Sequence, residues 1–206
     1  MKLFLASELK HPNTFSKLKE FIGGFEGKSI AYIPTAANGE GWNQWKDGGT
    51  WNLVKNTKAD ITIVQLEEYE SRDPIDDIKG KDILIVAGGY TGYLLYWMRK
   101  TKLNLKLKEL LDSGTIYVGT SAGCMATGTD MNFVEWYLGE GEPGAGCIPG
   151  LGLVDFNFYP HYKDYHYDQI KENFLGEKIY LVKDGEAIIV EDKNITIIGE
   201  QRIIEN

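Results

Sequence analysis

The stretch Gly119–Gly123, with the sequence GTSAG, places Ser121 between an apolar strand segment and a plausible helix start. A serine at such a strand-to-helix turn can form a nucleophile elbow, in which a strained backbone exposes the hydroxyl. The flanking glycines remove Cβ atoms where the strand and the helix crowd together. The same pentapeptide also occurs as an ordinary small-residue turn, so the assignment of Ser121 as a nucleophile depends on finding an activating base.

A base for this serine must come from three histidines, His11, His161 and His166. His161 follows Pro160 at the end of an alternating segment, a position from which a general base can reach neighbouring strands. His11 precedes Pro12 and is expected in a surface loop. His166 opens a helical run and is either a helix-surface residue or a substrate contact. The positions therefore favour His161 as the general base.

A third group should orient the base, and two acids are candidates. Asp184 and Glu186 flank Gly185 in an expected tight turn between two strands. Acids at turns are commonly solvated turn-formers, and their spacing alone does not single out either one.

A second glycine-rich stretch, Gly88–Gly92, ends the apolar segment DILIVA and precedes a helical pattern. It lacks the Gly-Lys-Ser/Thr of a phosphate-binding loop and the full dinucleotide fingerprint. It is either a simple helix start or a place where the N–H of Gly89 approaches a ligand. In the second case, the N–H groups of Gly89 and Ala122 would form an oxyanion hole.

Strand and helix patterns alternate from Lys2 to Gly119, which indicates an α/β fold with a mostly parallel, doubly wound sheet. The predicted strands are Lys2–Ser7, Ser29–Pro34, Ile61–Leu66, Asp82–Ala87 and Thr115–Gly119, and the predicted helices are Thr14–Gly24, Trp42–Asn56 and Thr91–Leu111, the last broken near Thr101.

The last third of the chain has closely spaced short strands instead. They predict an antiparallel meander on the same sheet, formed by Lys178–Val182, Ala187–Val190 and Ile195–Ile198. Gly139–Gly152 is predicted to be a loop near the carboxyl edge of the sheet, where ligands of such folds bind. We expect one domain over residues 1–206.

The composition restricts the class of protein. The chain has 206 residues, of which 43% are hydrophobic and 25% charged, and a net charge of −8 that argues against nucleic-acid binding. No segment approaches the roughly 20 apolar residues of a membrane span. Two cysteines make neither a disulfide framework nor a zinc site. We expect a cytoplasmic protein with free thiols and no metal, cofactor or membrane partner.

These motifs together resemble the peptidase E family of serine peptidases, which includes aspartyl dipeptidases and, more distantly, cyanophycinases. The resemblance implies a flavodoxin-like fold, as in class I glutamine amidotransferases, with serine in place of their cysteine. It implies Ser121 as nucleophile, His161 as general base, and Gly89 and Ala122 as oxyanion-hole amides. The acid of the family is typically a glutamate; here Asp184 matches best, and Glu186 is the alternative.

Two departures from the family concern the substrate. A Gly-Gly-Asn of the family is Gly88-Gly89-Tyr90 here, and the nearest match to the basic residue thought to bind the aspartate of the substrate is His166. Both departures argue against strict specificity for Asp-X dipeptides. An aromatic pocket is the alternative, although at least half of its candidate residues are expected to be core or surface aromatics: Trp42, Trp45, Tyr90, Trp136, Tyr159, Tyr162 and Tyr165.

The expected activity is hydrolysis of small peptides through an acyl-enzyme on Ser121, by a monomer or a homodimer. The alternatives are another acyl hydrolase on the same site, such as an esterase or a modified-peptide hydrolase, and a non-catalytic relative that binds a small ligand. Glutaminase-like activity is disfavoured because Cys124, three residues beyond Ser121, is predicted to be a small buried hydrophobe.

Overall fold

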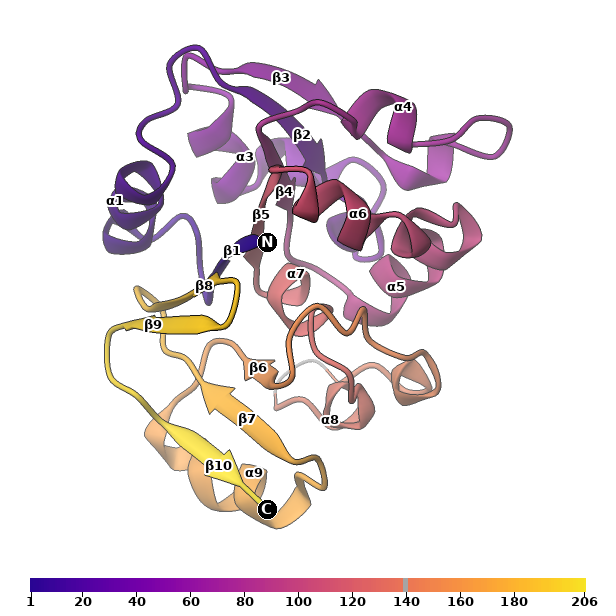
Figure 1. Ribbon diagram of the computed structural model, residues 1–206. Coiled ribbons are helices and arrows are strands. Elements are labelled where there is room, and N and C mark those ends of the chain that lie inside the picture. The colour runs from indigo at the N-terminus through magenta and orange to yellow at the C-terminus, as the bar shows by residue number, and fades with distance from the viewer. Residues whose placement is uncertain (139–140) are drawn as a thin grey trace.

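The computed structural model describes residues 1–138 and 141–206 (Figure 1). Within this part of the chain, seven strands form a central sheet in the order β3-β2-β4-β5-β1-β8-β9. Strands β1 to β5 run parallel, and β8 and β9 extend the sheet antiparallel at one edge. The mixed α/β fold with a mostly parallel sheet is thus confirmed. The bounds are β1 Lys2–Ala6, β2 Ser29–Ile33, β3 Asp60–Ile63, β4 Ile83–Val86, β5 Ile116–Thr120, β8 Ala187–Glu191 and β9 Asn194–Ile198.

Both faces of the central sheet are covered, as the apolar runs require. In β4, Leu84 and Val86 belong to a hydrophobic cluster with residues of α5 and α6, whereas Ile83 and Ile85 belong to a cluster with residues of α1 and α3 (Figure 1). All four side chains are fully buried. The α-helices are α1 Pro12–Phe21, α2 Thr35–Asn38, α3 Gly49–Val54, α4 Ile75–Ile78, α5 Thr91–Lys100, α6 Leu107–Asp112, α7 Ala122–Met125, α8 Asn132–Glu135 and α9 Tyr167–Asn173.

A second, three-stranded sheet corrects one prediction. The hairpin β8–β9 is confirmed, but Lys178–Val182 does not join it as a meander. Instead, β7 (Lys178–Leu181) pairs in parallel with β6 (Asn157–Tyr159) and antiparallel with β10 (Ile203–Glu205). The segment between β7 and β8 therefore crosses from one sheet to the other, and this crossing contains Asp184.

The predicted helix Trp42–Asn56 is also wrong as a single element. It is a 3₁₀ helix, Gln44–Asp47, followed by α3, and Gly48 between them is extended at φ −68° and ψ 146°. Adjacent glycines favour such a break because they carry a high entropic cost inside a helix. The predicted break near Thr101 is confirmed, since α5 ends at Lys100 and α6 begins at Leu107 after a 3₁₀ turn at Leu103–Leu105.

The predicted loop Gly139–Gly152 includes Gly139 and Glu140, which lie outside the described residues. In the rest of it, Ala145–Cys147 forms a 3₁₀ helix. The Glu142 carboxylate accepts hydrogen bonds from the backbone N–H groups of Thr91 and Gly92, both at 2.7 Å. This contact holds the loop against the start of α5, beyond the carboxyl end of β4, as expected.

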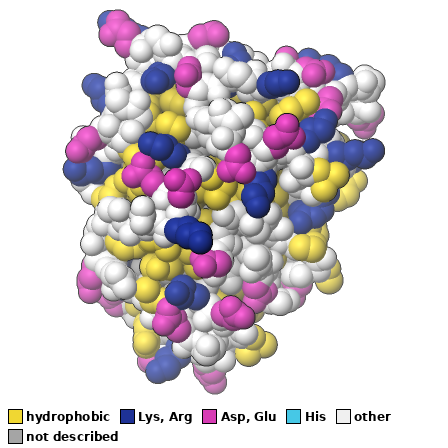
Figure 2. Space-filling view, in the orientation of Figure 1, with side chains coloured by type: hydrophobic (Ala, Val, Ile, Leu, Met, Phe, Trp, Pro, Cys, Tyr) yellow, Lys and Arg dark blue, Asp and Glu magenta, His cyan; other side chains and the backbone are white. Residues whose placement is uncertain are grey.

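The surface in view mixes both signs of charge. On the face shown in Figure 2, acidic and basic side chains are interspersed, and hydrophobic side chains lie between them. Across the described residues, no helix has both the length and the apolar character needed to cross a bilayer.

Candidate active site

Ser121 lies in a strained turn between β5 and α7. Its φ of 50° and ψ of −114° fall outside the usual regions for a residue with a side chain. The flanking glycines allow the close packing around this turn. A Cβ on Gly119 would come within 2.7 Å of the Gly123 carbonyl oxygen, and a Cβ on Gly123 within 2.3 Å of the Val86 carbonyl oxygen. The backbone therefore has the geometry of a nucleophile elbow.

His161 follows β6 and Pro160 and faces this turn. Its Nε2 lies 3.1 Å from the Ser121 Oγ, and its Nδ1 lies 2.6 Å from the Asp184 Oδ1. His161 also has a positive φ of 53°, which is uncommon for a residue other than glycine. Two of the three side chains in this arrangement thus stand on strained backbone, as residues at functional sites often do.

Asp184 is ionised and fixes the tautomer of His161. Burial would raise the pKa of Asp184, but the positive charge that His161 carries when protonated, hydrogen bonds from His161 and Ser7, and the charge of Lys163 outweigh it and hold that pKa below its usual range. An ionised carboxylate only accepts hydrogen bonds, so the hydrogen of neutral His161 resides on Nδ1. The Nε2 atom is then free to accept the hydrogen of the Ser121 hydroxyl.

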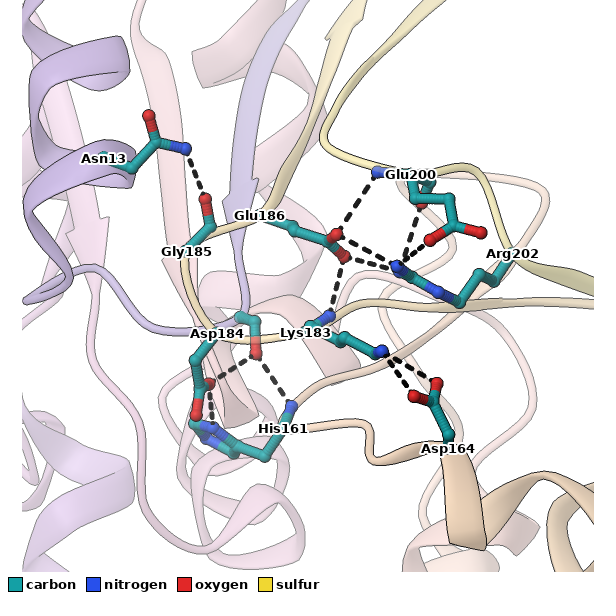
Figure 3. Close-up of polar contacts among 10 residues, drawn as sticks. Asn13, His161, Asp164, Lys183, Asp184, Gly185, Glu186, Glu200 and Arg202 are labelled. Atoms are coloured by element: carbon teal, nitrogen blue, oxygen red, sulfur yellow. Dashed lines mark hydrogen bonds and ion pairs between the residues drawn. The ribbon is translucent and has the colours of Figure 1, made fainter.

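Glu186 lies two residues beyond Asp184 but takes part in a different set of contacts (Figure 3). Its carboxylate pairs with Arg202 at 2.7 Å and accepts hydrogen bonds from the backbone N–H groups of Lys183 and Glu200. The structure therefore brings Asp184, and not Glu186, against His161.

The Gly88-Gly89 turn after β4 packs beside the serine. A Cβ on Gly88 would lie 3.0 Å from the Ser121 Cβ, and a Cβ on Gly89 would lie 2.3 Å from the Ala36 carbonyl group. Gly89 has a φ of 130°, which favours glycine. Among the described residues, no protein acceptor is found for the N–H of Gly89 or of Ala122. Neither N–H group is therefore occupied by a protein acceptor in the described part of the chain.

Two cavities, of about 570 and 350 Å³, meet at Ser121, His161 and Gly89. Of the aromatic residues considered from the sequence, Trp45 lines the larger cavity and Tyr90 the smaller. The others lie elsewhere: Trp42 and Tyr165 are exposed, Tyr159 and Tyr162 are buried, and Trp136 packs against the hydrophobic core. Three aromatic residues that the sequence did not single out complete the walls, namely Tyr32, Trp51 and Tyr137.

The two other histidines do not join the arrangement around Ser121. His166 lines neither of the two cavities and packs against the rings of Tyr159, Tyr162 and Tyr165. Burial and the charge of Lys163 lower its pKa. His11 caps the start of α1 through Nδ1, which accepts a hydrogen bond from the Asn13 backbone N–H.

The described cysteines and acids do not gather into a metal site. Cys124 is buried in α7, where burial raises the pKa of its thiol, and Cys147 is an exposed free thiol. Over residues 1–138 and 141–206, no three His, Cys, Asp or Glu side chains converge as metal ligands.

Ser7 is a site residue that was missed in the sequence. Its hydroxyl lies at the end of β1, accepts a hydrogen bond from the His161 backbone N–H at 2.7 Å and donates one to the Asp184 carboxylate at 3.0 Å. One feature of the sequence could have indicated Ser7: it lies at the end of a predicted parallel strand, and the carboxyl ends of parallel strands lie together at the edge of the sheet where ligands bind.

A strained serine that follows a strand of a parallel sheet, hydrogen-bonded to a histidine that in turn contacts an aspartate, is an arrangement typical of hydrolases with a nucleophile elbow. Comparison with known proteins gives the family. Residues 3–198 match Peptidase family S51, and the chain belongs to this family.

Relatives of the chain agree with this assignment. It is 25% identical over 207 residues to an uncharacterized peptidase of Pasteurella multocida, covering 98% of this chain and 99% of that protein. It is 27% identical over 209 residues to peptidase E of Nostoc sp., covering 91% and 78%. The crystal structure of a candidate peptidase E protein from Listeria monocytogenes EGD-e shares the fold, with a TM-score of 0.79 at 22% identity over 95% of this chain and 96% of that one.

Proposed function

We propose that the protein is a serine-type, dipeptidase-like hydrolase that cleaves small peptides through an acyl-enzyme on Ser121. One observation carries the proposal: hydrogen bonds run without a gap from the Ser121 hydroxyl through His161 to Asp184. This is the arrangement by which a weak nucleophile is activated by an oriented base. Membership of a peptidase family supports a peptide as the substrate.

The geometry suggests an ordered sequence of proton transfers. His161 Nε2 takes the hydroxyl proton as Ser121 Oγ attacks the scissile carbonyl, and the N–H groups of Gly89 and Ala122 stabilise the resulting oxyanion. His161 then gives the proton to the leaving amine, and the C–N bond breaks. His161 then deprotonates a water that attacks the acyl-enzyme carbonyl; the bond from the acyl carbon to Ser121 Oγ breaks, and His161 returns the proton to Oγ. Asp184 stays ionised throughout and stabilises the imidazolium.

The proposal is tested with a library of dipeptides and N-blocked peptides, read by mass spectrometry. The expected result is cleavage of short peptides by the parent chain. Cleavage of free but not N-blocked peptides would show that the site requires a free amino terminus. If simple esters turn over while no peptide in the library is cleaved, the site belongs to another acyl hydrolase.

If the Gly89 N–H stabilises the oxyanion, a side chain at this position should lower kcat. A Gly89→Ala variant should lower kcat by roughly 10²- to 10³-fold, since the new Cβ would meet the Ala36 carbonyl group and displace the N–H. Steady-state kinetics on a cleaved dipeptide measures this loss, and circular dichroism checks the fold. Gly80→Ala is the matched control, because Gly80 also has a positive φ, of 80°, but has open space around it. Equal kcat losses in the two variants would show that backbone strain, not a lost donor, is responsible.

The charges around the cavities predict weak selection for aspartate. Among the described residues that line them, Lys10 is the only lysine or arginine, and it is paired with Glu8 at 2.8 Å. Glu40 lines both cavities. An aspartate side chain would thus find no lysine or arginine other than the paired Lys10 among the described lining residues, so Asn-Leu should be cleaved at least as fast as its near-isostere Asp-Leu. A kcat/KM for Asp-Leu more than about tenfold higher would contradict this prediction.

A further inference from the structure

Ser7 connects the three chain segments that carry the proposed triad. It directly follows β1, whose last residue, Ala6, accepts a hydrogen bond at its carbonyl oxygen from the Ser121 backbone N–H at 3.2 Å. Its hydroxyl bridges the His161 backbone N–H and the Asp184 carboxylate. Its own N–H donates to the Glu186 carbonyl oxygen at 3.2 Å. Ser7 therefore contacts both the turn that carries His161 and the turn that carries Asp184.

The environment of Ser7 fixes which group donates and which accepts in each of these hydrogen bonds. The residue is fully buried, and its hydroxyl donates to the same Asp184 oxygen that receives His161 Nδ1–H. The hydroxyl has one hydrogen, which it donates to Asp184. The Ser7 Oγ atom therefore accepts the hydrogen bond from the His161 N–H through a lone pair. A buried donor or acceptor that loses its partner pays a desolvation cost, so the three groups hold one another in place.

The hydrogen bond from the His161 N–H to Ser7 supports a residue whose φ is positive. A non-glycine residue in this region persists only where its surroundings hold it. The bond from the His161 N–H to Ser7 fixes the backbone at the strained residue itself, while the Asp184 contact fixes the ring. Ser7 thus constrains both ends of the histidine.

We propose that Ser7 is a positioning residue that sets His161 and Asp184 in register for catalysis at Ser121, through its hydrogen bonds to both. This inference rests on the proposed serine-hydrolase function and extends it to a residue outside the triad. It differs from a general stabilising role because it predicts an effect on turnover that depends on Asp184.

The test is Ser7→Ala, measured by peptide hydrolysis and by the rate at which a fluorophosphonate labels Ser121. Both rates should fall by about 10- to 100-fold with KM within about twofold, because small displacements of a catalytic group cost rate and not binding. Ser7→Cys, which fills similar space with a weaker hydrogen-bonding group, should lie between the parent and Ser7→Ala. A Ser7→Cys variant as fast as the parent in both assays would overturn the proposal.

Ser29→Ala is the matched control. The Ser29 hydroxyl makes the same two kinds of contact at the opposite end of the sheet: it accepts from the Asp82 backbone N–H at 3.1 Å and donates to the Asp82 carboxylate at 2.8 Å. Its loss should lower thermal stability and leave both rates unchanged. If Ser29→Ala lowers the hydrolysis and labelling rates as much as Ser7→Ala does, the effect of Ser7 is structural and the proposal is wrong.

The double variant Ser7→Ala/Asp184→Asn distinguishes an effect of Ser7 on the position of the triad from an effect on the stability of the fold. Once Asp184→Asn has disrupted the triad, adding Ser7→Ala should slow hydrolysis by less than about threefold, because residues that act as a unit are not additive. Full additivity would overturn the proposal. The labelling assay keeps the two hypotheses distinct: equal labelling of Ser121 in the parent and in Ser7→Ala defeats only the role of Ser7, whereas a parent that is neither labelled nor active defeats the proposed function.

Discussion

A Ser121→Ala variant is expected to hydrolyse small peptides on the order of 10⁵-fold more slowly than the parent chain. The change removes the proposed nucleophile, since Ser121 Oγ is, among the described residues, the hydroxyl within hydrogen-bonding distance of His161 Nε2. The N–H groups at Gly89 and Ala122 remain, so a residual rate above the uncatalysed one should persist. Steady-state kinetics on a peptide that the parent cleaves measures the loss.

Ser113→Ala is a suitable comparison for this variant. Ser113 precedes β5 at its other end, and its hydroxyl donates to the Leu110 carbonyl oxygen at 2.7 Å. Its removal should leave the rate unchanged. Fluorophosphonate labelling followed by peptide mapping gives a second readout, in which the label should appear on Ser121 of the parent and disappear in Ser121→Ala. Undiminished hydrolysis by Ser121→Ala would refute the nucleophile assignment.

The parallel part of the fold could be predicted because its signals are local. Ile83–Val86 is a continuous apolar run that is buried on both faces, and such a run reads as a covered parallel strand without knowledge of its partners. The glycines that permit close packing at Ser121 are also a local signal, but the GTSAG motif alone is equally compatible with an ordinary small-residue turn.

The parts that were missed depend on contacts between distant segments. The pattern of Lys178–Leu181 suits a strand in either sheet, and its partner β6 is set by tertiary packing that a local pattern does not encode. The partners of Ser7 lie 154 and 177 residues away along the chain, so its spacing in the sequence carries no sign of them. Asp184 and Glu186 could not be distinguished from the sequence for the same reason, since the contacts that separate them, from Glu186 to Arg202 and from Asp184 to His161, join distant segments.

An Asp184→Asn variant is expected to lower kcat by roughly 10⁴-fold. The carboxamide has nearly the same shape, but its NH₂ group can donate a hydrogen bond to His161 Nδ1, which then loses its hydrogen to Nε2. An Nε2 that carries a hydrogen cannot accept the proton of Ser121. The imidazolium formed during the reaction would also lose its negative partner at 2.6 Å. Turnover of a cleaved dipeptide near neutral pH measures the effect, with circular dichroism as a check on the fold.

Glu186→Gln makes this prediction specific, because it applies the same chemical change two residues further on. The Glu186 carboxylate faces Arg202, whose side chain is 14% exposed, and two backbone N–H groups. Its neutralisation should therefore cost about 1–3 kcal/mol of unfolding free energy and change kcat little. Urea unfolding and turnover measured on both variants separate the roles of the two acids. The opposite pattern, with turnover lost in Glu186→Gln and kept in Asp184→Asn, would mean that the turn rearranges and that Glu186 is the acid that orients His161.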